Sequence, residues 1–412
     1  MASNRKQPGV CLLTETFHPL TGGGETQART LALGLARLGF RVTVVTRRTD
    51  RRLPRVSRVD GVEVRRLGPS GRAHLNKWGL CLTALAELVR RRREFDSMLV
   101  CGYRVLGIPA MTVSRLLGIP CILKADSLGE FSGAFFDPGL GKLGLNHKRL
   151  PVSVALRVRN RLFRRAAAFV AVSGAVREEL IAGGIPGDRI HDIPNSVDVR
   201  AFQPADPEQK ADARARLGIG RDRLVAVYTG RLVSTKGLPA LLRAWQGIAG
   251  SMPEALLLLV GAGGIGLQNC EAELREFVER HDLGRQIRFT GSVQDVREYL
   301  RAADLFVFPS LKESFGISVI EAMACGLPVI ASDIPGLSDV VLPGVTARVV
   351  PPHNGDALRD AMVEFLNDRS LRDRMGQAGR LRVEEQYSES RVVDRYDTLV
   401  RAPMHPDGYS ET

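Results

Sequence analysis

Several common signatures are missing from this sequence of 412 residues. It has no run of about eighteen apolar residues, which a membrane-spanning helix would need. The first apolar stretch, residues 9–17, is short and lacks a small-residue cleavage site, so no signal peptide is expected. The six cysteines are scattered, with no Cys-x-x-Cys pair and no nearby histidine at metal-binding spacing. We therefore expect buried thiols, no metal centre and a reducing cytoplasm.

Positive charge is concentrated in the first half of the chain. Residues 1–200 contain 33 Lys and Arg against 16 Asp and Glu, whereas the remainder contains 25 against 29. This asymmetry indicates an anionic partner for the first half, and nucleic acid and the anionic face of a membrane are the two candidates. A solubilising surface explains it about as well, because composition alone does not separate these readings.

Strand-length apolar runs alternate with helical stretches along the whole chain. Hydrophobic residues make up 44% of it, enough for two domains with sizeable cores. Continuous Val, Ile and Leu runs separated by helices predict parallel sheets covered on both faces. The Pro-rich, polar stretch 193–215 carries no strand pattern and is the natural boundary. We predict an α/β protein of two doubly wound, Rossmann-like domains facing across a cleft, residues 1–203 and 204–387. The expected strands lie near residues 10–16, 41–47, 97–103, 121–126, 168–173, 223–230, 255–261, 286–291, 305–310 and 327–333.

Three consecutive glycines, Gly22, Gly23 and Gly24, follow the first expected strand and precede a helical pattern. Glycine lets the backbone approach a ligand closely, and the N-terminal amides of the following helix favour an anion. A turn that needs positive φ is an equally good reading of three glycines alone.

A second candidate loop, residues 227–237, follows the first expected strand of the second domain. Arg231 is a planar cation with several donors and Lys236 is a compact, mobile one, so together they could flank a diphosphate. For either residue alone, a solvated surface charge is the better reading. Their position at a strand end favours phosphate binding.

A third loop contains Gly261, Gly263 and Gly266, a literal Gly-x-Gly-x-x-Gly between a strand and a helix. A nicotinamide site would also need an acidic residue at the end of the next strand, which here ends in Thr290 and Gly291. The fingerprint also belongs on the first strand of its domain, and this strand is a later one. An NAD(P)-dependent oxidoreductase is therefore retained only as an alternative.

Two glutamates eight positions apart, Glu313 and Glu321, mark the segment "ESFGISVIEAMACG". Glu313 is expected in the loop after strand 305–310, and Glu321 more than a turn into a helix that begins near residues 314–316. A loop carboxylate accepts hydrogen bonds from sugar hydroxyls, and free amides at the helix start face an anion. Stabilisation by the helix dipole explains Glu313 adequately. It explains Glu321 poorly, because that charge interrupts an apolar run.

With these motifs in place, the chain resembles the retaining glycosyltransferases of family 4, which have the GT-B fold. The resemblance covers nearly the whole chain, and the Glu-x7-Glu segment is its most specific element. It is carried by residues 22–46, 171–180, 193–202, 230–237, 290–310 and 313–321.

The resemblance implies roles for particular residues. Arg231 and Lys236 would hold the donor diphosphate, Glu313 would touch the donor sugar hydroxyls, and Glu321 would bind the nucleotide ribose. The implied backbone contacts are amides of Phe315, Gly316 and Ile317, contact with the base near Val293, and closure of Gly23 and Gly24 over the diphosphate. The helix at about residues 388–402 would cross back to the first domain.

The function implied is retaining transfer of a hexose from a UDP- or GDP-sugar to an acceptor hydroxyl, in cell-envelope or exopolysaccharide synthesis. The nucleotide diphosphate-sugar would be a co-substrate, and no obligatory cofactor or metal is implied. Besides the oxidoreductase, a non-catalytic basic protein that binds lipid or nucleic acid on the same scaffold is the other alternative.

One departure from the family concerns the segment 121–130. Many relatives carry a histidine at the end of this strand, and here the neighbourhood offers Lys124, Asp126, Ser127 and Glu130 instead. We predict that Asp126 contacts the donor or the acceptor, although a loop cap is a similarly good reading.

Two basic stretches suggest where the acceptor is found. Arg90–Arg93 end a helix, and residues 150–169 mix five arginines with Val, Leu and Phe, as in a basic helix lying on an anionic lipid surface. A helix that packs its apolar side on the sheet and solvates its arginines is the alternative. We expect a glycan or lipid-linked acceptor, no nucleic acid, and a cytoplasmic enzyme either free or peripheral on the inner face of the membrane.

Overall fold

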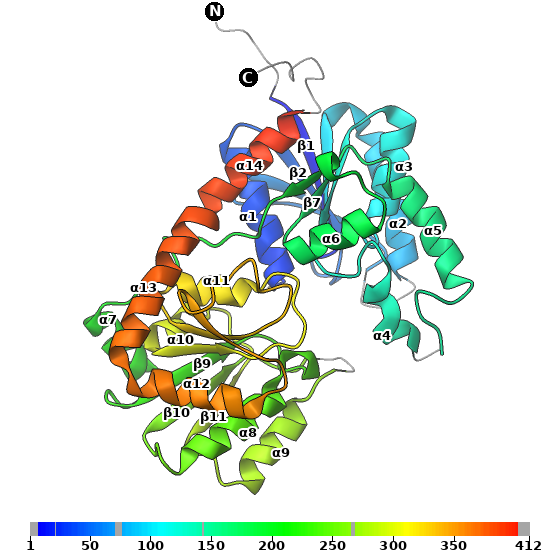
Figure 1. The fold of residues 1–412 in the computed structure, drawn as a ribbon. Coiled ribbons are helices and arrows are strands. Elements are labelled where there is room, and N and C mark those ends of the chain that lie inside the picture. Colours follow the sequence, from blue (N-terminus) through cyan, green and yellow to red (C-terminus); the bar gives the residue numbers. More distant parts are fainter. Residues whose placement is uncertain (1–6, 21, 71–75, 142–143, 265–267, 403–412) are drawn as a thin grey trace, which may run out of the picture. The chain divides into compact units, whose positions relative to one another are not determined.

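The computed structural model describes residues 7–20, 22–70, 76–141, 144–264 and 268–402. The chain forms two compact units (Figure 1), one of Met1–Asn195 with Glu389–Thr412 and one of Ser196–Ser388. Each unit is an α/β structure built on a largely or wholly parallel sheet, which confirms the predicted class.

The first unit contains an eight-stranded sheet in which only β3 runs antiparallel to its neighbour. Strand β1 lies in the middle, where Leu12 pairs with Val44 of β2 on one side and Leu99 of β5 on the other. All six residues of β1 are buried, as expected of a strand covered on both faces. The spatial order is β3 (Val56–Val59), β4 (Val62–Leu67), β2 (Arg41–Arg47), β1 (Gly9–Thr14), β5 (Ser97–Cys101), β6 (Cys121–Ala125), β7 (Ala168–Ala171) and β8 (Ile190–Asp192).

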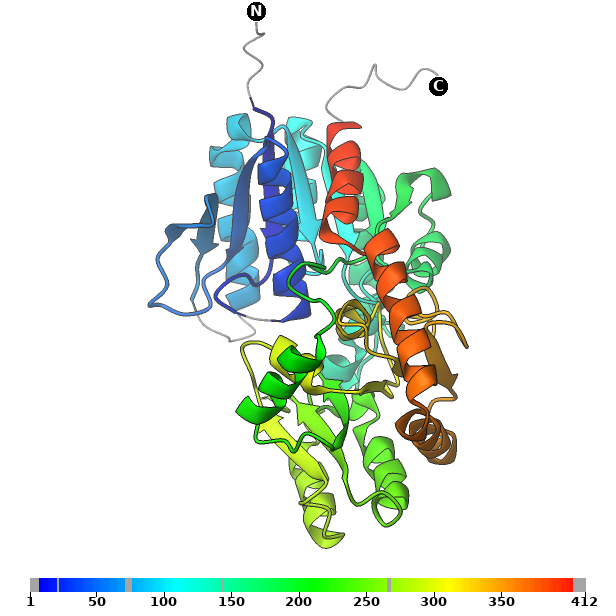
Figure 2. The same ribbon diagram turned by 90° about the vertical axis from the view of Figure 1, so that its left-hand side faces the viewer.

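Helices cover both faces of this sheet (Figure 2). Helix α1 (Gly23–Arg37) packs against the C-terminal helix α14 (Glu389–Arg401), and their apolar side chains join the sheet in one core. Helices α2 (Asn76–Arg90), α3 (Gly107–Leu117) and α5 (Val152–Phe163) pack side by side, α3 touching both others. Two more helices, α4 (Asp137–Leu140) and α6 (Gly174–Ala182), lie in the connections around β7.

The second unit contains a six-stranded parallel sheet. Its chain runs outward from β9 through β10 to β11 and then returns to β12 on the other side of β9, so the strand order reverses between β9 and β12. The spatial order is β11 (Ile287–Gly291), β10 (Ala255–Val260), β9 (Leu224–Thr229), β12 (Leu305–Phe308), β13 (Val329–Ser332) and β14 (Ala347–Val350).

The helices of the second unit pack in pairs. Helix α8 (Leu238–Ala249) touches α12 (Gly355–Asn367) and α9 (Glu271–Arg280), α10 (Arg297–Ala302) touches α7 (Pro207–Arg216), and α11 (Ile317–Ala324) touches α13 (Arg369–Gln386).

The short segment 196–203 belongs to the second unit. Its Val197 N–H donates to the Tyr387 carbonyl at 2.9 Å, and the Arg380 guanidinium donates to the carbonyls of Val199 and Phe202 at 3.0 and 2.6 Å. These bonds attach the segment to the end of α13, which explains why the division falls at Asn195 and not further along the Pro-rich stretch.

The cysteines are all free thiols. Five are buried as expected, whereas Cys81 is half-buried. Burial raises the pKa of the Cys101 and Cys325 thiols to about 12.

Within the described ranges, no group of three or more His, Cys, Asp or Glu side chains is arranged to hold a metal ion. No helix in those ranges combines the length and the apolar character that crossing a bilayer requires.

Candidate active site

The predicted site residues of the second unit gather at the switch point of its sheet. In open α/β sheets ligands bind beyond the carboxyl ends of the strands where the strand order reverses. Here that place is the pair of loops after β9 and β12, which carry Arg231, Lys236 and Glu313. The topology thus brings together two motifs that lie far apart in the sequence.

The loop after β9 is held in shape by the Tyr228 side chain and by close contacts with the loop after β12. The hydroxyl of buried Tyr228 donates to the Arg231 carbonyl at 2.9 Å. Gly237 has φ of +68°, and a Cβ there would stand 1.9 Å from the Pro309 carbonyl oxygen, so only glycine fits. The Leu311 N–H donates to the Thr235 carbonyl at 2.8 Å. The two loops therefore form one rigid edge.

Two cationic side chains, Lys236 and Arg231, lie at this edge, and among the described residues only Lys236 is paired with a carboxylate. Lys236 forms an ion pair with Glu313, and its ammonium lies 5.3 Å from the centre of the Phe308 ring. The Ser310 hydroxyl donates to the same Glu313 carboxylate at 3.2 Å. Arg231 is exposed, and its guanidinium has no hydrogen bond or ion pair to any residue that the structure describes. Arg231 is thus free to meet an anion, while Lys236 and Glu313 hold each other in place.

Helix α11 begins at Ile317, within one residue of the predicted start. Its N-cap is Gly316 with φ of +87°, and a Cβ there would stand 2.5 Å from the Leu337 side chain. The N–H groups of Phe315, Gly316 and Ile317 make no hydrogen bond within the described part of the chain. Such free amides at a helix start favour an anion.

Glu321 lies in the second turn of α11 and is half-buried. Burial raises the pKa of its carboxyl to about 7. Among the described residues, no hydrogen-bond donor or cation reaches this carboxylate. A half-buried acid without a partner is unfavourable in a helix that serves only packing, which supports a ligand role.

The third glycine loop is used for packing in this protein. A Cβ at Gly261 would stand 1.9 Å from the Gly230 carbonyl oxygen, and one at Gly263 would stand 1.7 Å from Asn269 Oδ1. The Gly263 N–H already donates to Glu271 at 2.8 Å, so this amide is not available to a pyrophosphate. Gly266 lies outside the described residues. The glycines bring the loops after β9 and β10 together, which leaves the nicotinamide alternative without support.

Val293, expected near the nucleotide base, is half-buried in the loop after β11.

In the first unit, Gly23 and Gly24 form the first turn of α1 and are exposed. A Cβ at Gly24 would meet no atom within 4 Å, so the protein's own packing does not require a glycine there. The loop is instead fixed by Glu25, which accepts a hydrogen bond of 2.6 Å from the Thr16 hydroxyl.

Asp126 lies at the carboxyl end of β6 and forms an ion pair with Lys124. Lys124 is 3% exposed and also donates to Asn195 Oδ1 at 3.1 Å. Burial opposes the Lys124 ammonium, yet Asp126 and its neighbours raise its pKa, so the charge is kept. The Asp126 carboxylate is therefore held by Lys124 at the carboxyl end of the first sheet. This ion pair does not fit the reading of Asp126 as a simple loop cap.

The structure adds two charged groups beside Asp126 that sequence reasoning did not assign. A Cβ on Gly102 would lie 3.3 Å from Asp126 Oδ2, 3.8 Å from Arg104 Nη2 and 3.9 Å from Glu130 Oε1. Glu130 is fully buried, burial raises its pKa to about 8, and its nearest cation is Arg104 Nε at 3.6 Å. The only sequence signal for this cluster is that each member follows a predicted strand end.

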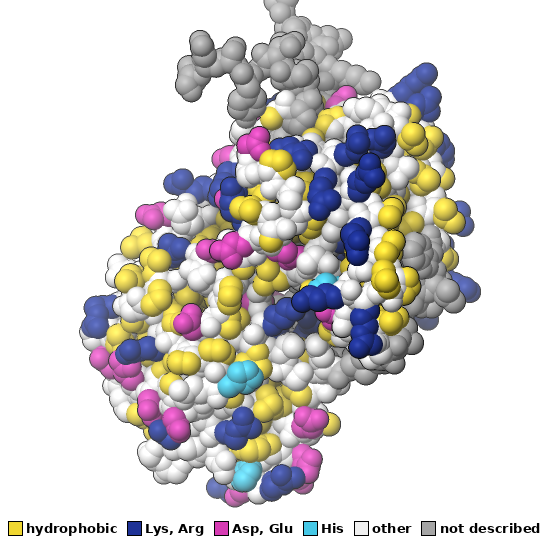
Figure 3. Space-filling view, turned by 45° about the vertical axis from the view of Figure 1, so that its right-hand side comes forward, with side chains coloured by type: hydrophobic (Ala, Val, Ile, Leu, Met, Phe, Trp, Pro, Cys, Tyr) yellow, Lys and Arg dark blue, Asp and Glu magenta, His cyan; other side chains and the backbone are white. Residues whose placement is uncertain are grey.

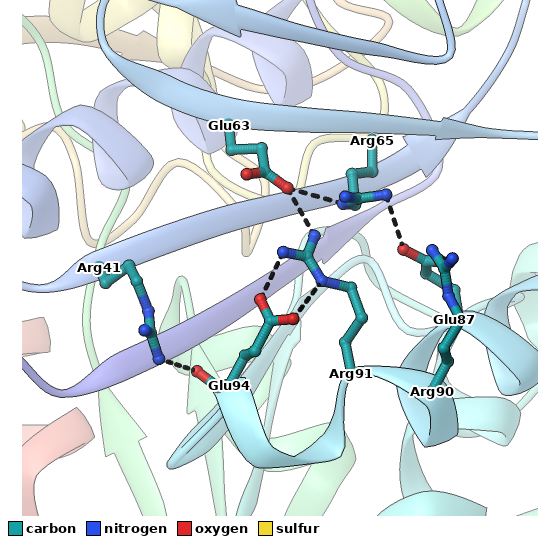
Figure 4. Close-up of polar contacts among 7 residues, drawn as sticks. All are labelled: Arg41, Glu63, Arg65, Glu87, Arg90, Arg91 and Glu94. Atoms are coloured by element: carbon teal, nitrogen blue, oxygen red, sulfur yellow. Dashed lines mark hydrogen bonds and ion pairs between the residues drawn. The ribbon is translucent and has the colours of Figure 1, made fainter.

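The arginines of the basic stretch Arg90–Arg93 differ in their surroundings. Arg91 pairs with Glu63 at 2.5 Å and with Glu94, while Arg90 pairs with Glu87 at 2.5 Å (Figure 4). Arg65 links Glu63 and Glu87 at 2.6 and 3.1 Å, which joins these pairs in one network. Half of the run Arg90–Arg93 is therefore neutralised, and it is a weaker anion-binding feature than its sequence indicates.

A separate pocket of about 480 Å³ lies beside edge strand β8 and contains none of the predicted site residues. Arg177 and Arg395 line it, but both donate to backbone carbonyls of the strand. These two arginines therefore protect the open edge of the first sheet at β8.

Comparison with known proteins agrees with this geometry. Residues 209–382 match the family described as Glycosyl transferases group 1, and residues 21–201 match Glycosyltransferase Family 4. A GDP-mannose-dependent monoacylated alpha-(1-6)-phosphatidylinositol monomannoside mannosyltransferase of Corynebacterium glutamicum is 34% identical over 219 residues, 51% of this chain and 55% of that one.

Several solved structures resemble nearly the whole chain, and two of them show the extent of the likeness. Sucrose-phosphate synthase from Thermosynechococcus elongatus has a TM-score of 0.81 and 25% identity, covering 97% of this chain and all of that one. Anabaena HepE in complex with UDP and glucose has a TM-score of 0.76 and 20% identity, covering 95% and 99%.

The fold and the family matches define a glycosyltransferase of the GT-B class. The chain belongs to the family 4 glycosyltransferases, since the two family matches together account for most of its length. The resemblance seen in its motifs is thereby confirmed.

Proposed function

We propose that the protein transfers a hexose, with retention of configuration, from a UDP- or GDP-sugar to an acceptor hydroxyl. The observation that carries the proposal is the set of unsatisfied groups at the switch point of the second sheet. Arg231, the amides at Phe315–Ile317 and the carboxylate of Glu321 all lack partners among the described residues. A nucleoside diphosphate offers phosphates to the first two and ribose hydroxyls to the third.

The chemistry asked of these residues is mainly electrostatic. The bond from the sugar anomeric carbon to the diphosphate oxygen breaks, and the acceptor oxygen forms its bond on the same face. The departing phosphate oxygen takes the acceptor proton. Arg231, Lys236 and the amides before α11 supply fixed positive potential where the negative charge develops, which is usually the largest catalytic contribution. No metal is required for these steps.

Glu313 has a positioning role as well as a binding role in this proposal. Its carboxylate accepts bonds from Lys236 and Ser310 and has lone pairs left for a sugar hydroxyl. Asp126, Gly23 and Gly24 belong to the other unit, and contact of these residues with donor or acceptor stays a prediction.

For the acceptor we propose a lipid-linked glycan or glycolipid at the inner face of the cell membrane, in cell-envelope or exopolysaccharide synthesis. The excess of Lys and Arg in residues 1–200 supports an anionic surface as partner. The name of the Corynebacterium glutamicum relative, which gives GDP-mannose as donor and an acylated phosphatidylinositol mannoside as acceptor, supports this chemistry.

Thermal unfolding with UDP, GDP, ADP and NAD tests the donor class, because a ligand that prefers the folded protein raises its Tm. One nucleoside diphosphate is expected to raise the Tm of the wild type, and Glu321→Ala is expected to lose most of that shift. Arg243→Gln, an exposed change on α8, is the control and should keep it. Stabilisation by NAD alone would overturn the proposal.

A further inference from the structure

Helix α5 turns an arginine inward and valines outward. Arg159 is 8% exposed and donates to the carbonyls of Glu130 and Phe131 at 2.9 and 2.6 Å. Val154 and Val158 are 45% and 68% exposed, and Leu150 just before the helix is 69% exposed. An amphipathic helix that served only the core would show the reverse pattern. The outer side of α5 therefore needs another explanation.

The exposed groups form one continuous stripe along α5. Residues three and four apart share a side of a helix, which places Val154, Arg157, Val158 and Arg161 in line, and exposed Arg165 follows in the turn after the helix. We call Leu150 and these five residues the α5 stripe. The side chains of its three arginines are exposed, and their guanidinium groups make no hydrogen bond or ion pair with any described residue. The stripe thus combines free cations with aliphatic surface.

No carboxylate offsets this charge nearby in the chain. Residues 138–167 contain no Asp or Glu, and neither do residues 105–125, which include the neighbouring helix α3. In Figure 3, which turns this side of the first unit toward the reader, dark blue and yellow side chains lie next to one another on the surface.

Helix α5 packs on the loops at the carboxyl end of the first sheet, the end at which Asp126 lies. The Phe163 ring packs edge-on against Tyr103 at 5.4 Å, and Asn160 Nδ2 donates to the Phe131 carbonyl at 2.9 Å. Leu156 packs against Gly133. All three partners lie in loops after β5 or β6, and Asp126 begins the second of these loops.

We propose that the α5 stripe docks the first unit on a bilayer containing anionic lipid. Its valines and leucine enter the boundary between headgroups and acyl chains, and its arginines meet lipid phosphates. A nucleic acid fits less well, because neither α3 nor α5 exposes an aromatic side chain on which bases could stack. The reason for such docking would be the capture of a lipid-linked acceptor, and this part of the inference rests on the proposed function. The binding itself rests on α5.

Flotation with lipid vesicles tests the proposal directly. The wild-type protein is expected to float with vesicles of phosphatidylcholine mixed with phosphatidylglycerol and not with phosphatidylcholine alone, and to dissociate as salt is raised. Arg157→Gln with Arg161→Gln should lower the partition coefficient about thirtyfold, since each basic residue near the surface contributes about fivefold. Val154→Asp with Val158→Asp should abolish flotation even at low salt.

Matched controls separate docking from folding and from catalysis. Val345→Asp, at an exposed valine of the second unit, should float like the wild type. The Tm shift with the nucleoside diphosphate should stay unchanged in both α5 variants, so failure of docking and failure of the proposed donor site are read separately. Equal flotation of Val154→Asp/Val158→Asp and the wild type would overturn the proposal. Tighter binding of the wild type to a single-stranded oligonucleotide than to the anionic vesicles would also overturn it.

Discussion

The ammonium group of Lys236 pairs with the carboxylate of Glu313, 77 positions away in the chain. Both side chains are mostly buried, with 15% and 13% of their surfaces exposed. The pair connects the loop after β9 to the loop after β12, where the strand order of the second sheet reverses. Each member is therefore both a ligand group and a support for the other.

Separate replacement of the two partners distinguishes these roles. Lys236→Met removes a donor to phosphate and is expected to weaken binding of the nucleoside diphosphate about tenfold or more, since a charge-assisted bond contributes roughly 1.5–3 kcal/mol. Glu313→Gln should change that affinity only about threefold yet abolish most sugar transfer. Isothermal titration calorimetry and a transfer assay measure the two effects. An equal loss of diphosphate affinity in both variants would mean that Glu313 acts only by holding Lys236.

The raised pKa of Glu321 makes donor binding depend on pH. Ribose hydroxyls donate to an ionised carboxylate, and burial raises the pKa of this carboxyl to about 7. Affinity for the nucleoside diphosphate should therefore increase as the pH rises through about 7. In Glu321→Gln the affinity should be lower, and what pH dependence remains should come from the nucleotide phosphates. Titrations between about pH 5.5 and 8.5 compare the two proteins, and parallel curves would exclude Glu321 as the ribose ligand.

The same group should affect the stability of the free protein in the opposite direction. A carboxyl whose folded-state pKa is raised binds its proton more tightly in the folded protein. Its stabilising contribution is complete below the unfolded value of about 4.3 and is lost as the pH rises through about 7. The Tm of Glu321→Gln relative to wild type should therefore increase between these pH values. Differential scanning fluorimetry without nucleotide measures it, and a constant difference would contradict the assignment.

Gly237 should be one of the least replaceable glycines of the second unit. Alanine there would adopt a φ of +68° and place its Cβ 1.9 Å from the Pro309 carbonyl oxygen. Gly218 is a matched control, because its φ is +61° and a Cβ there would meet no atom within 4 Å. Gly218→Ala should cost about 1 kcal/mol for the backbone conformation alone, and Gly237→Ala about 3 kcal/mol or more. Urea unfolding measures both, and equal losses would show that the loops after β9 and β12 can separate without penalty.

The sequence predicted the second unit well because its signals are local. The apolar strands, the glycines at strand ends and the start of α11 near Gly316 each depend on a few neighbouring residues. Family resemblance then connected Glu313 and Glu321 with Arg231 and Lys236. The Lys236–Glu313 pair itself was not visible, because which strand ends meet depends on the order of strands in the sheet.

The first unit was harder to predict because its features depend on tertiary packing. Arg91 and Arg92 look alike in the sequence, yet Arg91 pairs with Glu63 from a distant strand while Arg92 is exposed. In the second unit, the Gly261 loop also depends on tertiary packing, because it resembles a dinucleotide fingerprint and only the fold shows that the Gly230 carbonyl oxygen lies where a Cβ on Gly261 would stand. Helix α5 presented the same difficulty, since its pattern did not show which of its arginines turns inward.

Arg159 and Arg157 on α5 offer a direct test of that distinction. Arg159 is buried and satisfies the carbonyls of Glu130 and Phe131, whereas Arg157 is exposed. Arg159→Met should destabilise the protein by about 2–4 kcal/mol, because two buried carbonyls lose a charged donor. Arg157→Met should change stability by less than about 0.5 kcal/mol. Urea unfolding compares the two variants. If Arg157→Met were the more destabilising, α5 would be rotated about its axis, and the valines of the α5 stripe would face the core and not the solvent.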